Sequence, residues 1–141
     1  MDVLIFVRYH TEFGYCYRID KTNFLLDELA HFLSTEVMCF GTSRLTRLIN
    51  QLVEDGDSTS GNIIDIERKG KNLYLRYVYD EPEDLSEALE ISKKELFKLM
   101  PIWEQLMKEK PEEILLVRDN GKFELIGKSI SREVTHEDAE C

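Results

Sequence analysis

The stretch that decides the fold is Ile114-Leu115-Leu116-Val117-Arg118-Asp119-Asn120-Gly121-Lys122-Phe123-Glu124-Leu125-Ile126. Two apolar runs in it flank Asp119-Asn120-Gly121, and an Asn-Gly pair between such runs is the strongest local signal for a β-hairpin. Two further pairs of strand-like segments come earlier, residues 2–9 with 13–19 and residues 63–67 with 73–79. Because hairpins outnumber crossovers, the sequence predicts a mainly antiparallel sheet.

Apolar residues at helical spacing predict about three helices among these strands. They cover residues 23–35, 42–54 and 92–108, and a short apolar link, Val37-Met38-Cys39-Phe40, follows the first of them. Pro101 lies inside the third helix and should kink or interrupt it, because proline removes a backbone donor. The sequence therefore predicts an α+β fold in which the helices pack on one face of the sheet.

Short signals mark the remaining boundaries. Ser92 and Glu95 stand at the spacing of a capping box, which places a helix start there. Residues 55–61 are small and polar and have a glycine near each end, which is typical of a loop. Residues 89–91 indicate a short strand before the third helix.

The composition describes a globular protein with a large surplus of acid. The chain has 141 residues, with 28 acidic and 18 basic side chains and a net charge of −10. Because binding to phosphates needs a basic face, this charge argues against a nucleic-acid partner. The apolar run Val3 to Val7 is too short to cross a membrane. We expect one domain over residues 1–128, a flexible polar tail over residues 129–141 and, from the absence of a secretory signal pattern, a cytoplasmic location.

Few residues offer reactive chemistry. Cys16, Cys39 and Cys141 form no Cys-x-x-Cys pair, which indicates buried thiols and predicts neither a metal site nor a cofactor. His10 could act as the base for a thiolate at Cys16, but no third catalytic group accompanies them, so we expect no enzyme. The helix start at Gly41-Thr42-Ser43-Arg44 could hold an anion. These two features define the alternative function, a small enzyme or a ligand-binding domain.

Acidic residues gather in two places along the chain. The larger group is Asp80, Glu81, Glu83, Asp84, Glu87 and Glu90, and the smaller group is Glu54, Asp55 and Asp57. Such groups are often only solvated surface. The more specific interpretation is a docking site for a basic partner, because complementary charge raises association rates. Tyr74 and Tyr77 fit either half-buried packing or, on an open face beside carboxylates, a protein interface.

Three features together resemble the bacterial immunity proteins that neutralise contact-dependent and other polymorphic toxins. They are the opening strand Asp2-Val3-Leu4-Ile5-Phe6-Val7, the acidic run from Asp80 to Glu90 and the closing hairpin from Ile114 to Phe123. The resemblance implies a cytoplasmic, single-domain inhibitor without enzymatic activity. It implies a basic toxin domain as the partner, for example a nuclease, whose active site the carboxylates would mask. The oligomeric state stays open.

Overall fold

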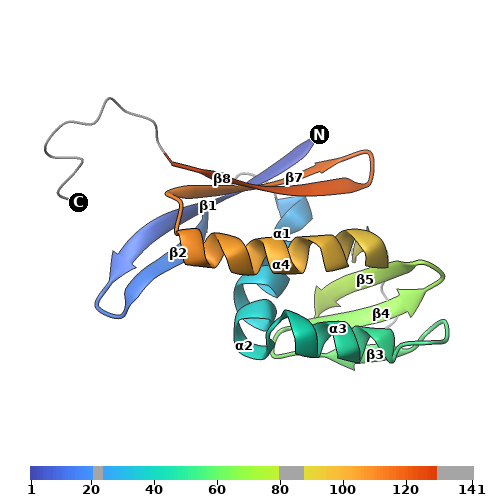
Figure 1. Cartoon of the computed structure of the whole chain (residues 1–141). Helices are drawn as coiled ribbons and strands as arrows, with labels where there is room; N and C mark the ends of the chain where they lie inside the picture. Colours follow the sequence, from blue (N-terminus) through green and yellow to red (C-terminus); the bar gives the residue numbers. More distant parts are fainter. Residues whose placement is uncertain (21–23, 80–87, 130–141) are drawn as a thin grey trace, which may run out of the picture.

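Hairpins from the two ends of the chain join into one sheet, here named sheet A. The computed structural model describes residues 1–20, 24–79 and 88–129. Sheet A has the strand order β2-β1-β7-β8; in Figure 1 its β7–β8 hairpin lies above α4 and its β1–β2 hairpin runs down to the left. Its strands are β1 (Asp2–Thr11), β2 (Gly14–Asp20), β7 (Glu113–Asp119) and β8 (Lys122–Lys128). The predicted hairpin between β7 and β8 is confirmed, and its turn residues Asn120 and Gly121 both have the positive φ that such a tight turn requires.

The middle of the chain builds a second sheet, sheet B, in the order β3-β4-β5-β6. Its strands are β3 (Ser58–Ser60), β4 (Ile64–Lys69), β5 (Asn72–Tyr77) and β6 (Leu89–Ser92). Both sheets are antiparallel, which confirms the α+β class. The expectation of a single sheet is wrong, because β1 takes β7 as its second partner and leaves β4 and β5 to pair with two short edge strands. One of these, β3, lies inside the segment that was expected to be a loop.

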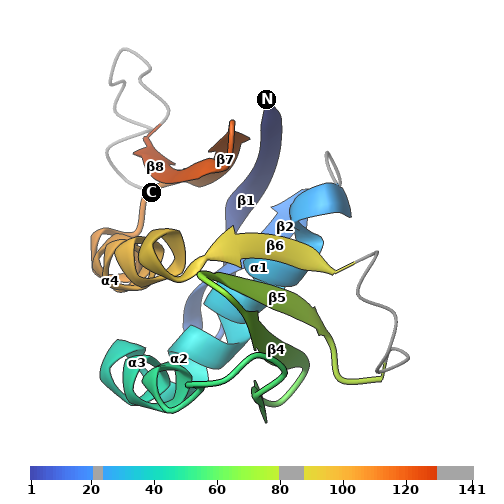
Figure 2. The same ribbon diagram turned by 90° about the vertical axis from the view of Figure 1, so that its right-hand side faces the viewer.

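A long helical segment follows β2 and separates the two sheets. It consists of η1 (Phe24–Leu26), α1 (Asp27–His31), the π-helical η2 (Phe32–Val37) and α2 (Met38–Phe40). The predicted link over residues 37–40 is therefore helical. The segment contacts β1 at its start and β5 through α1, and in Figure 2 it passes behind β5 and β6. Because it lies between two sheets, it buries side chains over most of its circumference: Leu26, Leu29, Ala30, Phe32, Leu33, Glu36 and Val37.

Two further helices complete the layer, α3 (Thr42–Asn50) and α4 (Lys93–Glu109). The Ser92 hydroxyl accepts a hydrogen bond from the Glu95 amide at 3.1 Å, which confirms the predicted helix start. Helix α4 is continuous through Pro101, so the expected interruption is wrong. Buried neighbours on both sides of the proline, Met100 and Trp103, hold the two halves of the helix in the core. Helix α4 contacts β8 and β6, so the helices cover both sheets rather than one face of one sheet.

One contiguous cluster of buried side chains connects both sheets with the helices between them. Trp103 lies at its centre, with its ring 4.8 Å from Phe6 and 6.5 Å from Tyr17 between centroids. Residues 130–141, which make up nearly all of the predicted tail, lie outside the described residues. In the described part of the chain, no helix has the length and apolar character that a membrane crossing needs.

Candidate functional site

The acidic residues singled out in the sequence lie in different parts of the structure. Asp80, Glu81, Glu83, Asp84 and Glu87 lie outside the described residues. Glu90 is exposed on the outer face of sheet B, where its carboxylate accepts hydrogen bonds from the Asn72 amide at 2.6 Å and the Tyr74 hydroxyl at 2.9 Å. The hydrogen bond from the Tyr74 hydroxyl to Glu90 is the main reason why the pKa of Tyr74 is raised. Tyr74 therefore lies beside a carboxylate on an open sheet face, which is the arrangement expected if the tyrosines form a protein interface.

The smaller acidic group builds the turn after α3. The Asp57 carboxylate accepts hydrogen bonds from the amides of Val53 and Glu54, at 3.1 and 3.0 Å. The Asp55 carboxylate accepts one from the Gly70 amide at 2.8 Å, which ties this turn to the β4–β5 hairpin. Asp55 and Asp57 thus have a local structural role, while Glu54 is exposed.

The outer face of sheet B carries paired charges at its centre. Arg76 is only 7% exposed, and its guanidinium lies 3.4 Å from the Asp65 carboxylate and 3.2 Å from the Glu67 carboxylate. One guanidinium faces two carboxylates here, so Arg76 offsets only part of the acid on this face and the group keeps a negative charge.

The predicted thiol and imidazole do not meet. In the β1–β2 hairpin His10 pairs with Tyr15, whereas Cys16 pairs with Tyr9. Neighbouring strand residues point to opposite faces, so the Cys16 thiol and the His10 ring lie on opposite sides of sheet A. Cys16 is half-buried and Cys39 is exposed, which corrects the expectation of buried thiols; Cys141 lies outside the described residues.

The predicted anion site at the start of α3 already holds a carboxylate of the protein. The amide and the hydroxyl of Thr42 both donate to Glu104 Oε1, each at 2.7 Å. These bonds, that of the hydroxyl first, lower the pKa of Glu104 below its ordinary value. Glu104 on α4 therefore caps α3 in the place that an external anion would take. Arg44 is not part of this contact, and its guanidinium lies 5.2 Å from the centre of the Phe40 ring.

This contact predicts a pH-dependent loss of stability when Glu104 is replaced. Because the folded-state pKa of Glu104 lies below 4.5, the contact stabilises the protein above that pH and is lost as the pH falls through the folded-state pKa. Glu104→Ala should lower the free energy of unfolding by about 1 kcal/mol at neutral pH, and by less in acid. Urea denaturation at both pH values measures the difference, with the exposed Glu109→Ala on the same helix as control. An equal loss at both pH values would contradict the assignment.

A tyrosine hydroxyl joins α1 to sheet B. Tyr77 donates a hydrogen bond to the Asp27 carboxylate, and His31 Nε2 lies 3.7 Å from the other oxygen of Asp27. Burial, followed by the bond to Asp27, raises the pKa of Tyr77 far above its ordinary value. The hydroxyl therefore stays protonated and acts as a structural donor rather than as a base. Among residues 1–20, 24–79 and 88–129, no group of His, Cys, Asp and Glu side chains is arranged to hold a metal ion.

The outer face of sheet A is aliphatic, although an open antiparallel sheet usually turns polar side chains to solvent. Along β1 the inner side chains Leu4 and Phe6 are buried, and the residues between and beside them face outward. The register places Ile5 opposite Leu115, and Leu115 opposite Ile126. We name this surface the aliphatic face; it consists of Val3, Ile5, Val7, Leu115, Val117 and Ile126.

No described element covers the aliphatic face. Val3, Ile5 and Val7 keep intermediate exposure, and Ile126 is 39% exposed. Charged side chains border the face, Arg18 and Asp20 on β2 and Glu113, Glu124 and Lys128 on β7 and β8. This surface was not predicted from the sequence, although the unbroken apolar runs of β1 and β7 are the pattern of strands that are apolar on both faces.

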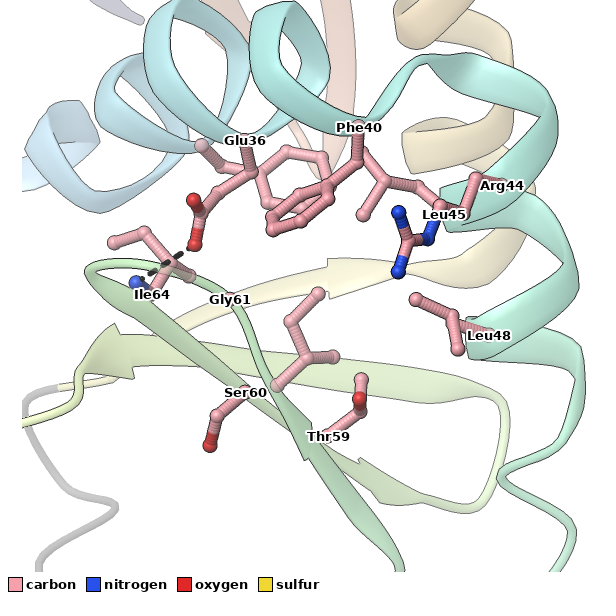
Figure 3. A pocket seen from close by; sticks show the side chains of 11 residues that line it. Glu36, Phe40, Arg44, Leu45, Leu48, Thr59, Ser60, Gly61 and Ile64 are labelled. Carbon is pink, nitrogen blue, oxygen red and sulfur yellow. Dashed lines mark hydrogen bonds between the residues drawn. The ribbon is translucent and has the colours of Figure 1, made fainter.

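A pocket of about 200 Å³ opens between the π-helical turn, α3 and sheet B (Figure 3). The Glu36 side chain, only 1% exposed, closes one end of it. Its two carboxylate oxygens accept hydrogen bonds from the amides of Asn62, Ile63 and Ile64, at 2.9, 3.2 and 3.0 Å. A buried charge is tolerable when it is satisfied in this way. Glu36 was not identified from the sequence, because one acid on an apolar helix carries no local signal.

A second hollow collects positive charge at the start of α4. It has a volume of about 600 Å³ and is lined by Arg68, Gly70, Lys71, Ser92, Lys93, Lys94 and Phe97. The amide of Lys93 donates to the carbonyl of Lys71 at 3.1 Å, which brings these two lysines together. The Arg68 guanidinium is engaged with the Val53 carbonyl, and Lys93 Nζ lies 5.5 Å from the Phe97 ring centre. Within the described residues, this acidic protein thus has a locally basic surface at the start of α4.

Compared with known protein families, with curated proteins and with solved structures, the chain matches none of them.

Proposed function

We propose that the protein is an inhibitor that binds and neutralises a cognate bacterial toxin domain. The observation that carries the proposal is the aliphatic face. Monomeric proteins rarely leave a contiguous apolar surface open, and such surfaces with polar borders mark sites of protein association. Leu115 lies at its centre between Ile5 and Ile126, and charged residues border it, which is the arrangement of an interface with an apolar centre and a polar rim.

The charge of the chain favours a basic partner. A net charge of −10 attracts a cationic domain over distances at which no contact exists yet. Asp80, Glu81, Glu83, Asp84, Glu87 and Glu90 carry much of this charge, with Glu54, Asp55 and Asp57. We assign these residues to the approach of the partner. All of them except Asp55 and Asp57, whose carboxylates are bound within the turn, would also mask its basic active site. We assign the aliphatic face to holding the partner. Glu54 and Glu90 are exposed, so their carboxylates can face a partner.

An inhibition assay tests the proposal directly. The reading frame next to the gene for this protein supplies the candidate toxin for the assay, purified as its toxin domain. We expect the purified protein to abolish the toxin's activity at equimolar concentration. Undiminished toxin activity at molar excess would contradict the proposal, because neutralisation by masking is stoichiometric.

The salt dependence of binding tests the role of charge separately. If the surplus acid steers the partner, raising the salt concentration from low to physiological should lower the association rate by about tenfold and leave the dissociation rate nearly unchanged. Stopped-flow mixing measures both rates. The double variant Glu54→Gln with Glu90→Gln should show a weaker salt dependence. An association rate that is independent of salt would exclude steering while leaving the aliphatic face as the docking surface.

A further inference from the structure

The pocket in Figure 3 has the size and the walls of a site for a small organic molecule. Its volume of about 200 Å³ exceeds the roughly 150 Å³ at which an apolar cavity in a protein binds benzene. Aromatic and aliphatic side chains form most of the wall: Phe32, Phe40, Leu45, Leu48, Ile64 and Ile66. The pocket therefore suits an apolar body of about one ring or one branched chain.

One cation faces this apolar space. Figure 3 shows the Arg44 guanidinium directed from α3 toward the strand that carries Thr59. It lies over the Phe40 ring, and no carboxylate in residues 1–20, 24–79 or 88–129 forms an ion pair with it. Glu36, the acid of the pocket wall, turns both oxygens to backbone amides at the other end of the cavity. The guanidinium thus keeps its planar set of donors available to a ligand.

The backbone around the pocket is shaped to keep it open. Gly61 approaches Glu36 so closely that a Cβ added there would lie 1.9 Å from Glu36 Oε2. Glu36 and Phe32 belong to the π-helical turn, a rare geometry that often occurs at functional sites. The Thr59 side chain reaches the pocket because Thr59 pairs with Ile66, whose side chain is on the inner face of sheet B. These features place a fixed apolar wall beside the Arg44 guanidinium.

We propose that this pocket binds a small monocarboxylate with an aromatic or branched aliphatic body. A guanidinium binds a carboxylate through two parallel hydrogen bonds, which orients the ligand with its charged end at Arg44. The body then lies against Phe40, Leu48 and Ile66. A single cation beside an apolar wall matches one negative charge better than the higher charge of a phosphate group. The site is separate from the aliphatic face, which lies on sheet A.

Titration with benzoate, followed by the backbone amide resonances of the full chain, tests this assignment. We expect saturable shifts at Gly61, Ile64 and Leu45, with a dissociation constant on the order of 1 mM for so small a probe. Benzyl alcohol, which has the same ring without the charge, should bind at least about tenfold more weakly. Inorganic phosphate should not shift these resonances. Shifts by phosphate at the same residues would show an anion site of another kind and overturn the proposal.

The matched variants are Arg44→Gln and Arg47→Gln, which remove one charge each from exposed positions of α3. Arg47 does not line the pocket, so its replacement should change the affinity for benzoate by less than about twofold. Arg44→Gln should weaken benzoate by about 10- to 100-fold and leave benzyl alcohol unchanged. Equal effects of both variants, or no saturable shift with benzoate in the unaltered protein, would contradict the site. Toxin neutralisation should survive Arg44→Gln, so the two proposals fail independently.

Discussion

Replacing Gly61 by alanine should destabilise the protein by about 4 kcal/mol, a large part of the stability of a single domain. The added Cβ would lie 1.9 Å from Glu36 Oε2 and 2.4 Å from its carboxyl carbon, so the buried side chain must leave its place. The amides of Asn62, Ile63 and Ile64 would then lose their acceptor inside the protein. Because Gly61 does not need a left-handed backbone, the loss reports on the contact with Glu36 alone.

A double-mutant cycle isolates this contact. Glu36→Ala alone should be destabilising, since it leaves the buried Ile64 amide and the part-buried amides of Asn62 and Ile63 without their acceptor. Once Glu36 is absent, Gly61→Ala has nothing to displace and should cost less than about 1 kcal/mol. Urea denaturation of the four proteins gives the coupling energy. If Gly61→Ala were equally harmful with and without Glu36, the close approach would not be the cause.

Leu115→Glu should weaken binding to the toxin by about 100-fold or more while the protein stays folded. Leu115 is at the centre of the aliphatic face, so a carboxylate there would lose its water on docking without gaining a partner. The added charge is negative, so its effect distinguishes docking on an apolar surface from binding by charge alone. If the basic partner were held by charge alone, one more acid would leave binding unchanged or strengthen it. Isothermal titration calorimetry with the toxin domain measures the change.

Ser58→Glu is the matched control for this variant, because it adds the same charge on the outer face of sheet B. It should not weaken the affinity for the toxin, because further acid on the face that carries Glu90 can only favour a basic partner. Thermal unfolding of both variants verifies the fold. If size-exclusion chromatography with light scattering showed a dimer that Leu115→Glu converts to monomer, a second copy would be the occupant of the aliphatic face, and that would contradict docking of the toxin there.

Local signals predicted most of the elements and little of their assembly. Asn120-Gly121 places the closing hairpin, and Ser92 with Glu95 places α4, because turns and caps depend on residues close in sequence. The pairing of β1 with β7 joins residues as distant as Asp2 and Arg118, and no local pattern specifies such a partner. The division into two sheets follows from this pairing and was therefore missed.

The candidate sites show the same limit. The sequence placed His10 and Cys16 near one another but could not show that the hairpin turns them to opposite faces. Thr42 was predicted to start a helix, but the carboxylate that binds its amide and hydroxyl belongs to Glu104 on another helix. The pocket depends on Glu36 and Gly61, which are far apart in the chain and become neighbours only in the folded protein.

The pairing of β1 with β7 sets the order of events during synthesis. Asp2 and Arg118, which form an ion pair at 2.7 Å, are 116 positions apart. At about 5–20 residues per second, a ribosome needs roughly 6 to 23 seconds to add the second after the first. During that interval β1 can pair with β2 but not with β7, so one of its edges stays open. The surface on which Leu115 lies forms only after both β1 and β7 have been made, so a partner cannot dock there while β7 is still missing from the growing chain.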